Sequence, residues 1–303
     1  MPNGKPYQSG ASPDDVLRRN YLAIEQTAGN IEAIRRGAYH EAAIYARRKY
    51  GAAPSPDEIA GIYRMMSGNN SLISATPDFA SFCLEFSGSG SFGFFEHEAD
   101  DSEEPTDTAS VAYMQNTYSD RAFRIFSRIF ERVTAAYHPG FREVCEEVYY
   151  GRSIYGILPV SSSNDGALSS FQRLMAKYDL KIALEADVEM NDESVMRFAL
   201  VKRGIGSLPA SLPELGGSFR YMDLSVTFNE GISAGAFISA LERLGALVIT
   251  VTSTPHPSHD FFADLPAVTV QLDISAADLD ALWIFLEASH IRYDVSGLYD
   301  ILN

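Results

Sequence analysis

The stretch GAFISALERLGALVITVTSTP, residues 235–255, changes from a helical pattern to a strand pattern at a single glycine. Gly245 is the residue type that most often follows a helix, because glycine adopts the left-handed backbone conformation without steric cost. The β-branched run after it is typical of a strand. These patterns predict a helix over 232–244 and a strand over 246–254.

The segments around this stretch repeat the same kinds of pattern. Ser275 and Asp278 form a capping signature, with Ser275 as the N-cap of a second helix. The elements predicted from Phe219 to the C-terminus are strand 219–228, helix 232–244, strands 246–254 and 267–274, helix 276–289 and strand 291–300. This βαββαβ order is the ferredoxin-like arrangement, in which two helices cover one face of an antiparallel sheet.

The central part of the chain alternates strand and helix patterns. The predicted elements are strand 111–114, helices 119–137 and 141–150, strand 153–160, helix 167–178 and strands 181–189 and 196–202. Such alternation indicates an α/β layer whose strands are at least partly parallel. The Gly/Pro-rich segment RGIGSLPASLPELGGS, residues 203–218, then separates this layer from the ferredoxin-like one.

The first hundred residues show helical signals followed by a Ser/Gly-rich segment. Ser12 and Ser55 each precede a proline and acidic residues, which predicts two helices, one running towards Tyr45 and one to about Met66. The segment SFCLEFSGSGSFGFFEHE, from residue 81, alternates apolar residues around a Ser/Gly turn and predicts a hairpin. Domains are therefore expected at 1–107, 108–204 and 218–303.

The composition limits the class of protein. Against 24 basic residues stand 40 acidic ones, and the formal net charge of −16 disfavours nucleic acid and anionic membranes as partners. The two cysteines have no metal-ligand spacing, and the polar N-terminus has no signal-peptide core. No apolar run approaches the roughly 20 residues that span a bilayer. We expect a soluble, cytoplasmic protein with no metal and no cofactor.

Two polar clusters have structural interpretations. His256 and His259, in the sequence HPSH, are expected in a hairpin loop without a third metal ligand. Glu185, Asp187 and Glu189 alternate along a predicted strand, which is typical of a solvent-facing row. An acid/base pair is the alternative interpretation of this acidic row.

The α/β part contains three notable motifs: VAYMQNTYSDRAF from residue 111, YGILPVSSSNDGAL from residue 155 and MRFALVKR from residue 196. Together with the ferredoxin-like module that follows them, these motifs resemble prephenate dehydratase with its C-terminal ACT domain. The resemblance covers the chain from about Ser110 to its end and rests mainly on the joint order of the pieces. It implies a periplasmic-binding-protein-like α/β domain that acts on prephenate.

The chain departs from the family at the catalytic motifs. After Leu-Pro the family has Ile-Glu-Asn-Ser, whereas this chain has Val-Ser-Ser and keeps only the final serine, Ser163. The family's Thr-Arg-Phe is Met-Arg-Phe here, so the threonine is absent and Arg197 is present. The resemblance leaves Arg197, Ser163 and Ser119 as the candidate catalytic residues. Only 30 positions (166 to 196) remain where the family has a second lobe, so the α/β domain is expected to be truncated.

The ACT-like part implies a second kind of site. ACT domains pair side by side and bind amino acids near the loop between the first strand and the first helix, and here that loop reads NEGISAGAF. The backbone amides at a helix start can receive a carboxylate. The resemblance therefore implies Asn229, Gly235, Ala236 and Ser253 as candidate ligand-binding residues. The family's later Glu-Ser-Arg-Pro motif reads Thr-Ser-Thr-Pro, which weakens phenylalanine binding specifically.

These observations favour a non-enzymatic relative of prephenate dehydratase, connected with phenylalanine biosynthesis. It is expected to act as a homodimer through ACT-like pairing, with an aromatic amino acid or a prephenate-like molecule as its ligand. One alternative is an active dehydratase, converting prephenate to phenylpyruvate, water and CO2 with Ser119, Ser163 and Arg197. The other is a purely structural dimerisation protein.

Overall fold

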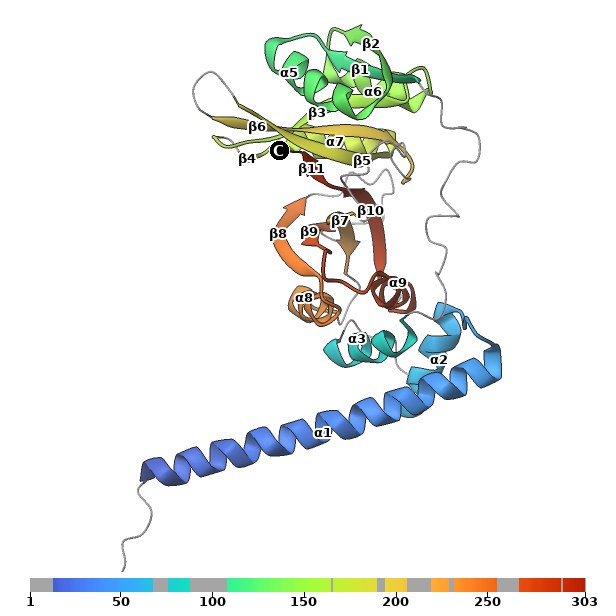
Figure 1. The fold of residues 1–303 in the computed structure, drawn as a ribbon, viewed down its shortest axis with the longest axis vertical. Helices are drawn as coiled ribbons and strands as arrows, with labels where there is room; N and C mark the ends of the chain where they lie inside the picture. The colour runs from blue at the N-terminus through green and yellow to red at the C-terminus, as the bar shows by residue number, and fades with distance from the viewer. Residues whose placement is uncertain are drawn as a thin grey trace, which may run out of the picture. The chain divides into compact units, whose positions relative to one another are not determined.

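The computed structural model describes residues 13–67, 76–87, 108–164, 166–189, 194–205, 219–228, 232–254, 267–289 and 291–302. The chain divides into two units, Met1–Pro54 and Ser55–Asn303. In the first unit the described residues form one helix of 38 residues, α1 (Pro13–Tyr50), as Figure 1 shows. The helix predicted at this end of the chain is confirmed, and neither Gly29 nor Gly37 interrupts it.

The second unit is built around one continuous sheet. Among the described residues it has 11 strands, nine of them in the order β2-β1-β3-β6-β5-β10-β7-β9-β8, with β4 beside β3 and β11 beside β5 (Figure 1). The strands are β1 (Thr108–Met114), β2 (Arg132–His138), β3 (Tyr155–Ser162), β4 (Gly166–Ala167), β5 (Leu180–Glu189), β6 (Val195–Arg203), β7 (Tyr221–Thr227), β8 (Leu247–Thr254), β9 (Ala267–Asp273), β10 (Arg292–Tyr299) and β11 (Ile301–Leu302). The predicted fold class, an α/β layer followed by a ferredoxin-like layer, is confirmed.

The α/β half begins with three parallel strands in the order β2-β1-β3. The connections are α5 (Thr117–Phe126) and α6 (Phe141–Tyr149), and they cover opposite faces of the sheet. Ile157 and Leu158, neighbours on β3, accordingly belong to the cores on the two faces. A third helix, α7 (Ser169–Tyr178), packs in the same core as α6.

The helix predicted over 119–137 is wrong in its second half. α5 ends at Phe126, and the residues from Arg132 to His138 form β2 instead. β2 pairs in parallel with β1 along its whole length. The β-branched Val133 and Thr134 suit an extended backbone, and the pairing satisfies the polar backbone groups along the outer side of β1.

The ferredoxin-like half has the predicted order of elements. Its strands lie in the order β10-β7-β9-β8 with every neighbouring pair antiparallel, and its helices are α8 (Ala234–Arg243) and α9 (Leu279–Ala288). The cap of α9 differs from the prediction. Asp278 accepts the capping hydrogen bond, whereas the Ser275 hydroxyl bonds the carboxylate of Asp273.

The two halves are joined strand to strand. β10 meets β5 in parallel at Gly297 and Ile182. A Cβ added at Gly297 would lie 2.6 Å from the Cβ of Ile182, so this close approach requires glycine. Three residues further along both segments, the Glu185 N–H donates to the carbonyl oxygen of Asp300 at 2.9 Å. The α/β layer and the ferredoxin-like layer therefore share one sheet, while the predicted domain boundaries stay a prediction.

Two short helices precede the sheet. The capping box predicted at the start of α2 (Pro56–Ser67) is confirmed, because Ser55 and Glu58 exchange side-chain to backbone hydrogen bonds. The hairpin predicted after it is wrong in its described part. Those residues form α3 (Pro77–Cys83) and a short 3-10 helix, η1 (Leu84–Phe86).

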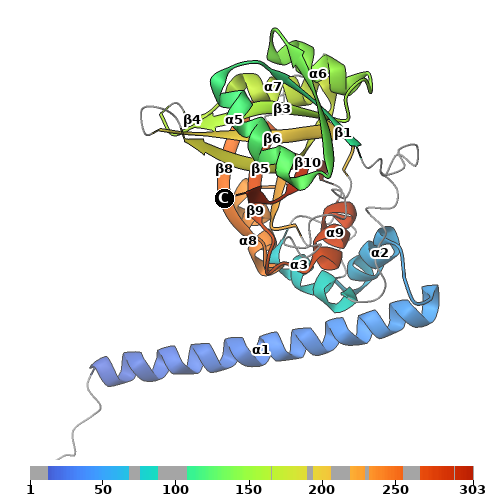
Figure 2. The same cartoon turned by 45° about the horizontal axis from the view of Figure 1, so that its top comes forward.

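α3 forms because Thr76 caps it, accepting the N–H of Phe79 at 3.2 Å, and because Pro77 occupies its first position. Its phenylalanines face inwards instead of alternating along a strand. The Phe79 ring lies 6.0 Å from the ring of Phe285 on α9, centroid to centroid. α2 and α3 thus cover the helices of the ferredoxin-like half, as Figures 1 and 2 both show.

Candidate functional site

The three predicted catalytic residues lie at one edge of the sheet. Ser119 follows the carboxyl end of β1, and Ser163 follows the carboxyl end of β3. β6 runs antiparallel to β3, so Arg197, near the start of β6, lies at the same edge. The order β2-β1-β3 makes the gap between β1 and β3 a topological switch point, where open α/β sheets usually bind ligands.

Ser119 is occupied by the cap of α5. The Asn116 side chain accepts the N–H groups of Tyr118 and Ser119 at 3.0 and 2.9 Å. Its amide nitrogen also donates to the Ser119 hydroxyl at 2.9 Å, and Ser119 is fully buried. Asn116 is therefore the N-cap of α5, and the Ser119 hydroxyl belongs to this cap.

Ser163 extends the pairing of β3 with β6. Its N–H donates to the carbonyl oxygen of Val195 at 2.8 Å, and its hydroxyl accepts the Val195 N–H at 3.0 Å. Both polar groups of Ser163 are therefore bonded to one residue of the neighbouring strand. The hydroxyl lies at an exposed position and holds the start of β6 in register.

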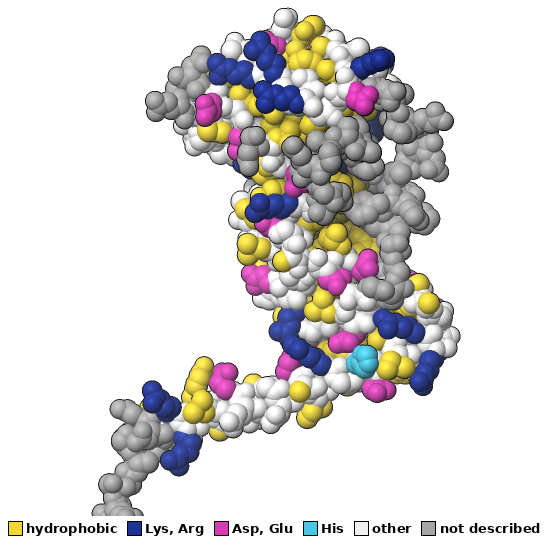
Figure 3. Space-filling view, in the orientation of Figure 1, with side chains coloured by type: hydrophobic (Ala, Val, Ile, Leu, Met, Phe, Trp, Pro, Cys, Tyr) yellow, Lys and Arg dark blue, Asp and Glu magenta, His cyan; other side chains and the backbone are white. Residues whose placement is uncertain are grey.

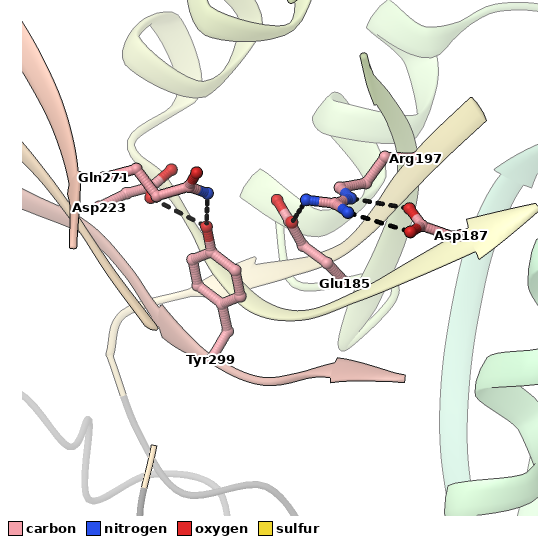
Figure 4. Close-up of polar contacts among 6 residues, drawn as sticks. All are labelled: Glu185, Asp187, Arg197, Asp223, Gln271 and Tyr299. Carbon is pink, nitrogen blue, oxygen red and sulfur yellow. Dashed lines mark hydrogen bonds and ion pairs between the residues drawn. The ribbon is translucent and has the colours of Figure 1, made fainter. Parts of the chain in front are cut away.

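Arg197 is held by carboxyl groups of the adjacent strand. Asp187, its register partner on β5, accepts hydrogen bonds from Nε at 2.7 Å and from Nη2 at 3.0 Å (Figure 4). These hydrogen bonds raise the pKa of Arg197 above its ordinary value. Arginine commonly grips a ligand carboxylate through the same two-pronged geometry. Here that fork already holds a carboxylate of the protein itself.

Glu185 is a buried carboxyl group beside this pair. Its side chain is 1% exposed, and its Oε2 lies 3.7 Å from Nη1 of Arg197. Oε2 accepts no hydrogen bond from the described residues. Burial raises the pKa of Glu185 to about 8, and the Asp223 carboxylate adds to the rise while Arg197 opposes it. Glu185 therefore carries a proton at neutral pH.

The solvent-facing row predicted on this strand is wrong at Glu185. Asp187 and Glu189 are exposed as predicted, but Glu185 lies deeper in the sheet. At that depth β5 has a strand on each side, with β6 along one edge and β10 and β11 along the other. Alternation alone could not reveal this, because it does not show how far an edge is covered.

A second group of polar side chains comes from the ferredoxin-like half. Tyr299, on β10, is fully buried, and its hydroxyl donates to Asp223 at 2.9 Å. Gln271 donates its amide hydrogen to the Tyr299 oxygen at 2.7 Å. Burial raises the pKa of Asp223 to about 6, although the hydrogen bonds from Tyr299 and Gln271 act in the opposite direction. We call the two groups together the junction cluster: Glu185, Asp187, Arg197, Asp223, Gln271 and Tyr299 (Figure 4).

The junction cluster sets three carboxyl groups against one guanidinium. The proton on Glu185 reduces this imbalance, and a protonated carboxyl group can act as a general acid. Sequence reasoning found Arg197 but missed Asp223, Gln271 and Tyr299. Asp223 and Gln271 are register partners on β7 and β9, and only the pairing of distant strands brings them beside Tyr299.

The predicted ligand-binding residues of the ferredoxin-like half lie outside the junction cluster. Gly235 and Ala236 stand in the first turn of α8, where the Ser233 hydroxyl accepts the N–H of Ala236 at 3.1 Å. One of the backbone amides expected to receive a ligand carboxylate is thus bonded inside the protein. Ser253 lies on β8, and Asn229 lies outside the described residues.

The described part of the chain contains no group of three or more His, Cys, Asp or Glu side chains arranged to hold a metal ion. None of its helices combines the length and apolar character needed to cross a membrane. The HPSH segment lies outside the described residues.

The fold is thus an α/β layer and a ferredoxin-like layer joined in one sheet. No protein-family model matches the sequence, and no curated protein matches it. Among solved structures, the prephenate dehydratase from Streptococcus mutans matches at 15% identity and a TM-score of 0.48, covering 64% of this chain and 100% of its own.

Two other solved structures show a comparable degree of similarity. GqqA, described as a novel type of quorum quenching acylase, matches at 20% identity and a TM-score of 0.46, over 63% of this chain and 94% of its own. The prephenate dehydratase from Arthrobacter aurescens, solved in complex with L-Phe, matches at 13% identity and a TM-score of 0.46, over 63% and 90%. With TM-scores below 0.5, function has to be argued from this chain's own residues.

Proposed function

We propose that this protein is a prephenate-dehydratase-like chain without dehydratase activity, which acts through small-molecule binding and pairing of its ferredoxin-like half. The observation that carries the proposal is the engagement of Arg197 by Asp187 at 2.7 and 3.0 Å. Prephenate has two carboxylates, which need cations or amide hydrogens to hold them during the reaction. The arginine retained from the family's Thr-Arg-Phe motif is already neutralised within the protein.

The two retained serines support the same conclusion. Ser119 is buried within the cap of α5, and Ser163 bonds Val195 on the neighbouring strand. Each hydroxyl therefore has a structural role that explains its retention without catalysis. The threonine that the family places before Arg197 is a methionine here. We infer that the turn containing Ser163 contributes to the fold and no longer to catalysis.

The outer strand β8 supports pairing with a second copy. β8 is the last strand of the described sheet and contains no charged residue. Leu247, Ile249 and Val251 are 62%, 44% and 48% exposed on it. An uncharged apolar edge strand offers unpaired backbone groups to another strand, and proteins that stay monomeric usually protect such edges with charges or proline. Two β8 strands pairing around a two-fold axis would extend the sheet.

The ligand of the paired form is proposed to be an aromatic amino acid. The start of α8, with Gly235 and Ala236, presents backbone amides of the kind that bind a carboxylate. Since Ser233 already caps Ala236, fewer amides are available than the resemblance alone implies, and binding is expected to be modest.

The deciding experiment is a prephenate to phenylpyruvate assay at high protein concentration, with Arg197→Ala as the matched variant. We expect no turnover from either folded protein. Turnover that disappears in Arg197→Ala would overturn the proposal. Asp187→Asn tests the reason directly, since releasing the guanidinium should allow the variant to bind prephenate where the unaltered protein does not.

Ligand binding and pairing are tested separately. Saturation with L-phenylalanine at a hundred times its dissociation constant should stabilise the fold by about 2.7 kcal/mol, seen as a rise in Tm. Val251→Lys should convert dimers to monomers in sedimentation velocity of dilute protein. A dimer that responds to no aromatic amino acid would instead support the purely structural alternative.

An active dehydratase is a second candidate, favoured by one observation. Glu185 carries a proton at neutral pH and lies beside Arg197, because burial raises its pKa to about 8. A neutral carboxyl group can protonate the departing hydroxyl of prephenate, giving water as CO2 leaves. This candidate predicts turnover in the assay above and its loss in Glu185→Gln.

A further inference from the structure

Helix α1 carries a row of apolar side chains on its outside. Leu17, Tyr21, Ile24 and Ile31 are 67%, 62%, 65% and 51% exposed. Their spacings are four, three and seven residues, and Ala28 fills the intervening place. This is the heptad pattern in which positions a and d line the contact between two helices. Figure 3 shows hydrophobic side chains standing out along the visible side of this helix.

Further along α1, residues on the same helical face are buried. Tyr39, Ala42 and Ala46 continue the row about two to four turns later and are buried, at 7%, 7% and 0% exposure. The face therefore divides into a covered C-terminal part and an uncovered N-terminal part. Contiguous exposed apolar side chains of this kind usually mark an interaction surface. We define the apolar row of α1 as Leu17, Tyr21, Ile24, Ala28 and Ile31.

The two flanks of the apolar row differ in charge. One flank, at the e positions, carries Arg18, Glu25 and Glu32. The other flank, at the g positions, carries the uncharged residues Asn20, Thr27 and Ile34. In an antiparallel pair of helices e faces e and g faces g, whereas in a parallel pair e faces g. Only the antiparallel arrangement therefore brings charges of opposite sign together.

We propose that the apolar row of α1 binds the same row of a second copy of this chain, with the two helices antiparallel. In the register that places Tyr21 against Ile24 of the second copy, Arg18 lies close to Glu25 of the second copy. The two-fold symmetry repeats the ion pair, so each dimer contains two of them. The uncharged g flanks then face each other without repulsion.

An anionic membrane is the other occupant that an apolar helix face with basic residues suggests. Glu25 borders the apolar row and would meet the anionic headgroups of such a surface. The chain as a whole has a net charge of −16, which opposes that approach. A second copy buries the apolar row, pairs Arg18 with Glu25 on one flank and brings no like charges together on the other. The observations therefore favour a second copy.

The contact spans two heptads, so the pairing is expected to be weak and concentration-dependent. It goes beyond the proposed function and does not depend on a ligand or on β8. Both can operate in one molecule, since they use different elements. Experiments on α1 are accordingly made in the full-length chain carrying Val251→Lys, which removes pairing through β8.

Disulfide trapping tests the antiparallel register. The native Cys83 and Cys145 are fully buried, and burial raises the pKa of Cys83 well above its ordinary value and that of Cys145 to about 12, so neither reacts. Arg18→Cys and Glu25→Cys are made in separate chains. We expect a disulfide-linked dimer when the two are mixed and mildly oxidised, and little from either alone.

Three results of the disulfide-trapping experiment would contradict the proposal. An Arg18→Cys dimer formed without the Glu25→Cys chain would indicate another helix arrangement and overturn the proposed one. No linked dimer in any mixture of folded proteins would overturn the pairing itself. Binding to phosphatidylserine vesicles that is lost in Ile24→Asp, without any disulfide, would assign the apolar row to a membrane.

Charge reversal gives an independent test. Arg18→Glu turns both ion pairs of the dimer into repulsive pairs and should weaken association about tenfold, and Glu25→Arg should do the same. Combining the two substitutions should restore the affinity of the unaltered chain. Ile24→Asp should abolish association, while Leu22→Asp, at an exposed position outside the apolar row, should leave it unchanged. Equal weakening by Leu22→Asp, or no recovery in the combined variant, would contradict the proposal.

Discussion

The junction cluster and the apolar row of α1 break the usual division of polar and apolar side chains in opposite ways. In the junction cluster Tyr299 and Glu185 are both buried, where β10 meets β5. The apolar row exposes half or more of each of its four large side chains to solvent. Buried charge needs partners within the chain, whereas exposed apolar surface needs a partner from outside it. The polar groups of the junction cluster find their partners within one chain, whereas the apolar row of α1 can be buried only by another molecule.

The largest effect is expected from the charge in the junction cluster. Folding raises the pKa of Glu185 from 4.5 to about 8, so the folded protein holds this proton more tightly than the unfolded chain. The contribution of Glu185 to stability is therefore fully present below about pH 4.5, is lost as the pH rises and levels off above about pH 8. The loss is on the order of 5 kcal/mol. Urea unfolding between pH 5 and 9 measures it.

Glu185→Gln should remove most of this pH dependence and make the protein more stable than the unaltered chain at pH 9. Glu189→Gln, an exposed position near the end of the same strand, is the matched control and should keep it. Parallel pH profiles for Glu185→Gln and the unaltered chain would show that Glu185 is not the buried acid.

The joint beneath the junction cluster gives the next effect. Gly297→Val places a side chain where a Cβ already meets Ile182 at 2.6 Å, so β10 has to move away from β5. Overpacking of this kind costs about 3 kcal/mol, seen in the midpoint of urea unfolding. Gly61→Ala, on α2 with open space around its Cβ, should be neutral or slightly stabilising. An unchanged midpoint in Gly297→Val would mean that the two layers are not tightly joined there.

The hydrogen bonds of Tyr299 give a smaller effect. Tyr299→Phe keeps the ring but leaves Asp223 without its donor at 2.9 Å. A lost bond to a buried carboxylate costs about 2 kcal/mol. Amide hydrogen exchange should show faster opening of β7 and β10 in this variant. Tyr150→Phe, at a position 63% exposed, should change neither stability nor exchange, and equal effects of the two would contradict the role of Tyr299.

Much of the fold could be predicted from sequence because it is encoded locally. The ferredoxin-like order follows from Gly245, the capping residues and the β-branched runs, and the structure confirms it. The wrong predictions concern segments whose local pattern is compatible with both a helix and a strand. Phe82 and Phe86 alternate as in a strand, yet Thr76 and Pro77 start a helix before them, and helix contacts with Phe285 decide the outcome.

The candidate site was harder to predict because it depends on distant pairings. Arg197 was found by its motif, but its partner Asp187 follows from the register of β5 against β6. Glu185 was placed in solvent, because the sequence does not show that β10 and β11 cover the far edge of β5. The candidate ligand residues near α8 stay a prediction.

The smallest effect on the free energy of unfolding is expected from substitutions in the apolar row of α1. The same substitution at a buried position should have a much larger effect. Ile24→Ala, at a position 65% exposed, should change the free energy of unfolding of dilute protein by less than about 0.5 kcal/mol. Ile157→Ala, the same substitution at a fully buried position, should cost about 2–5 kcal/mol. At high concentration Ile24→Ala should instead weaken self-association, because its side chain is buried only in the pair. A large loss in dilute protein would place Ile24 in a contact within the chain, and α1 would then need no second copy.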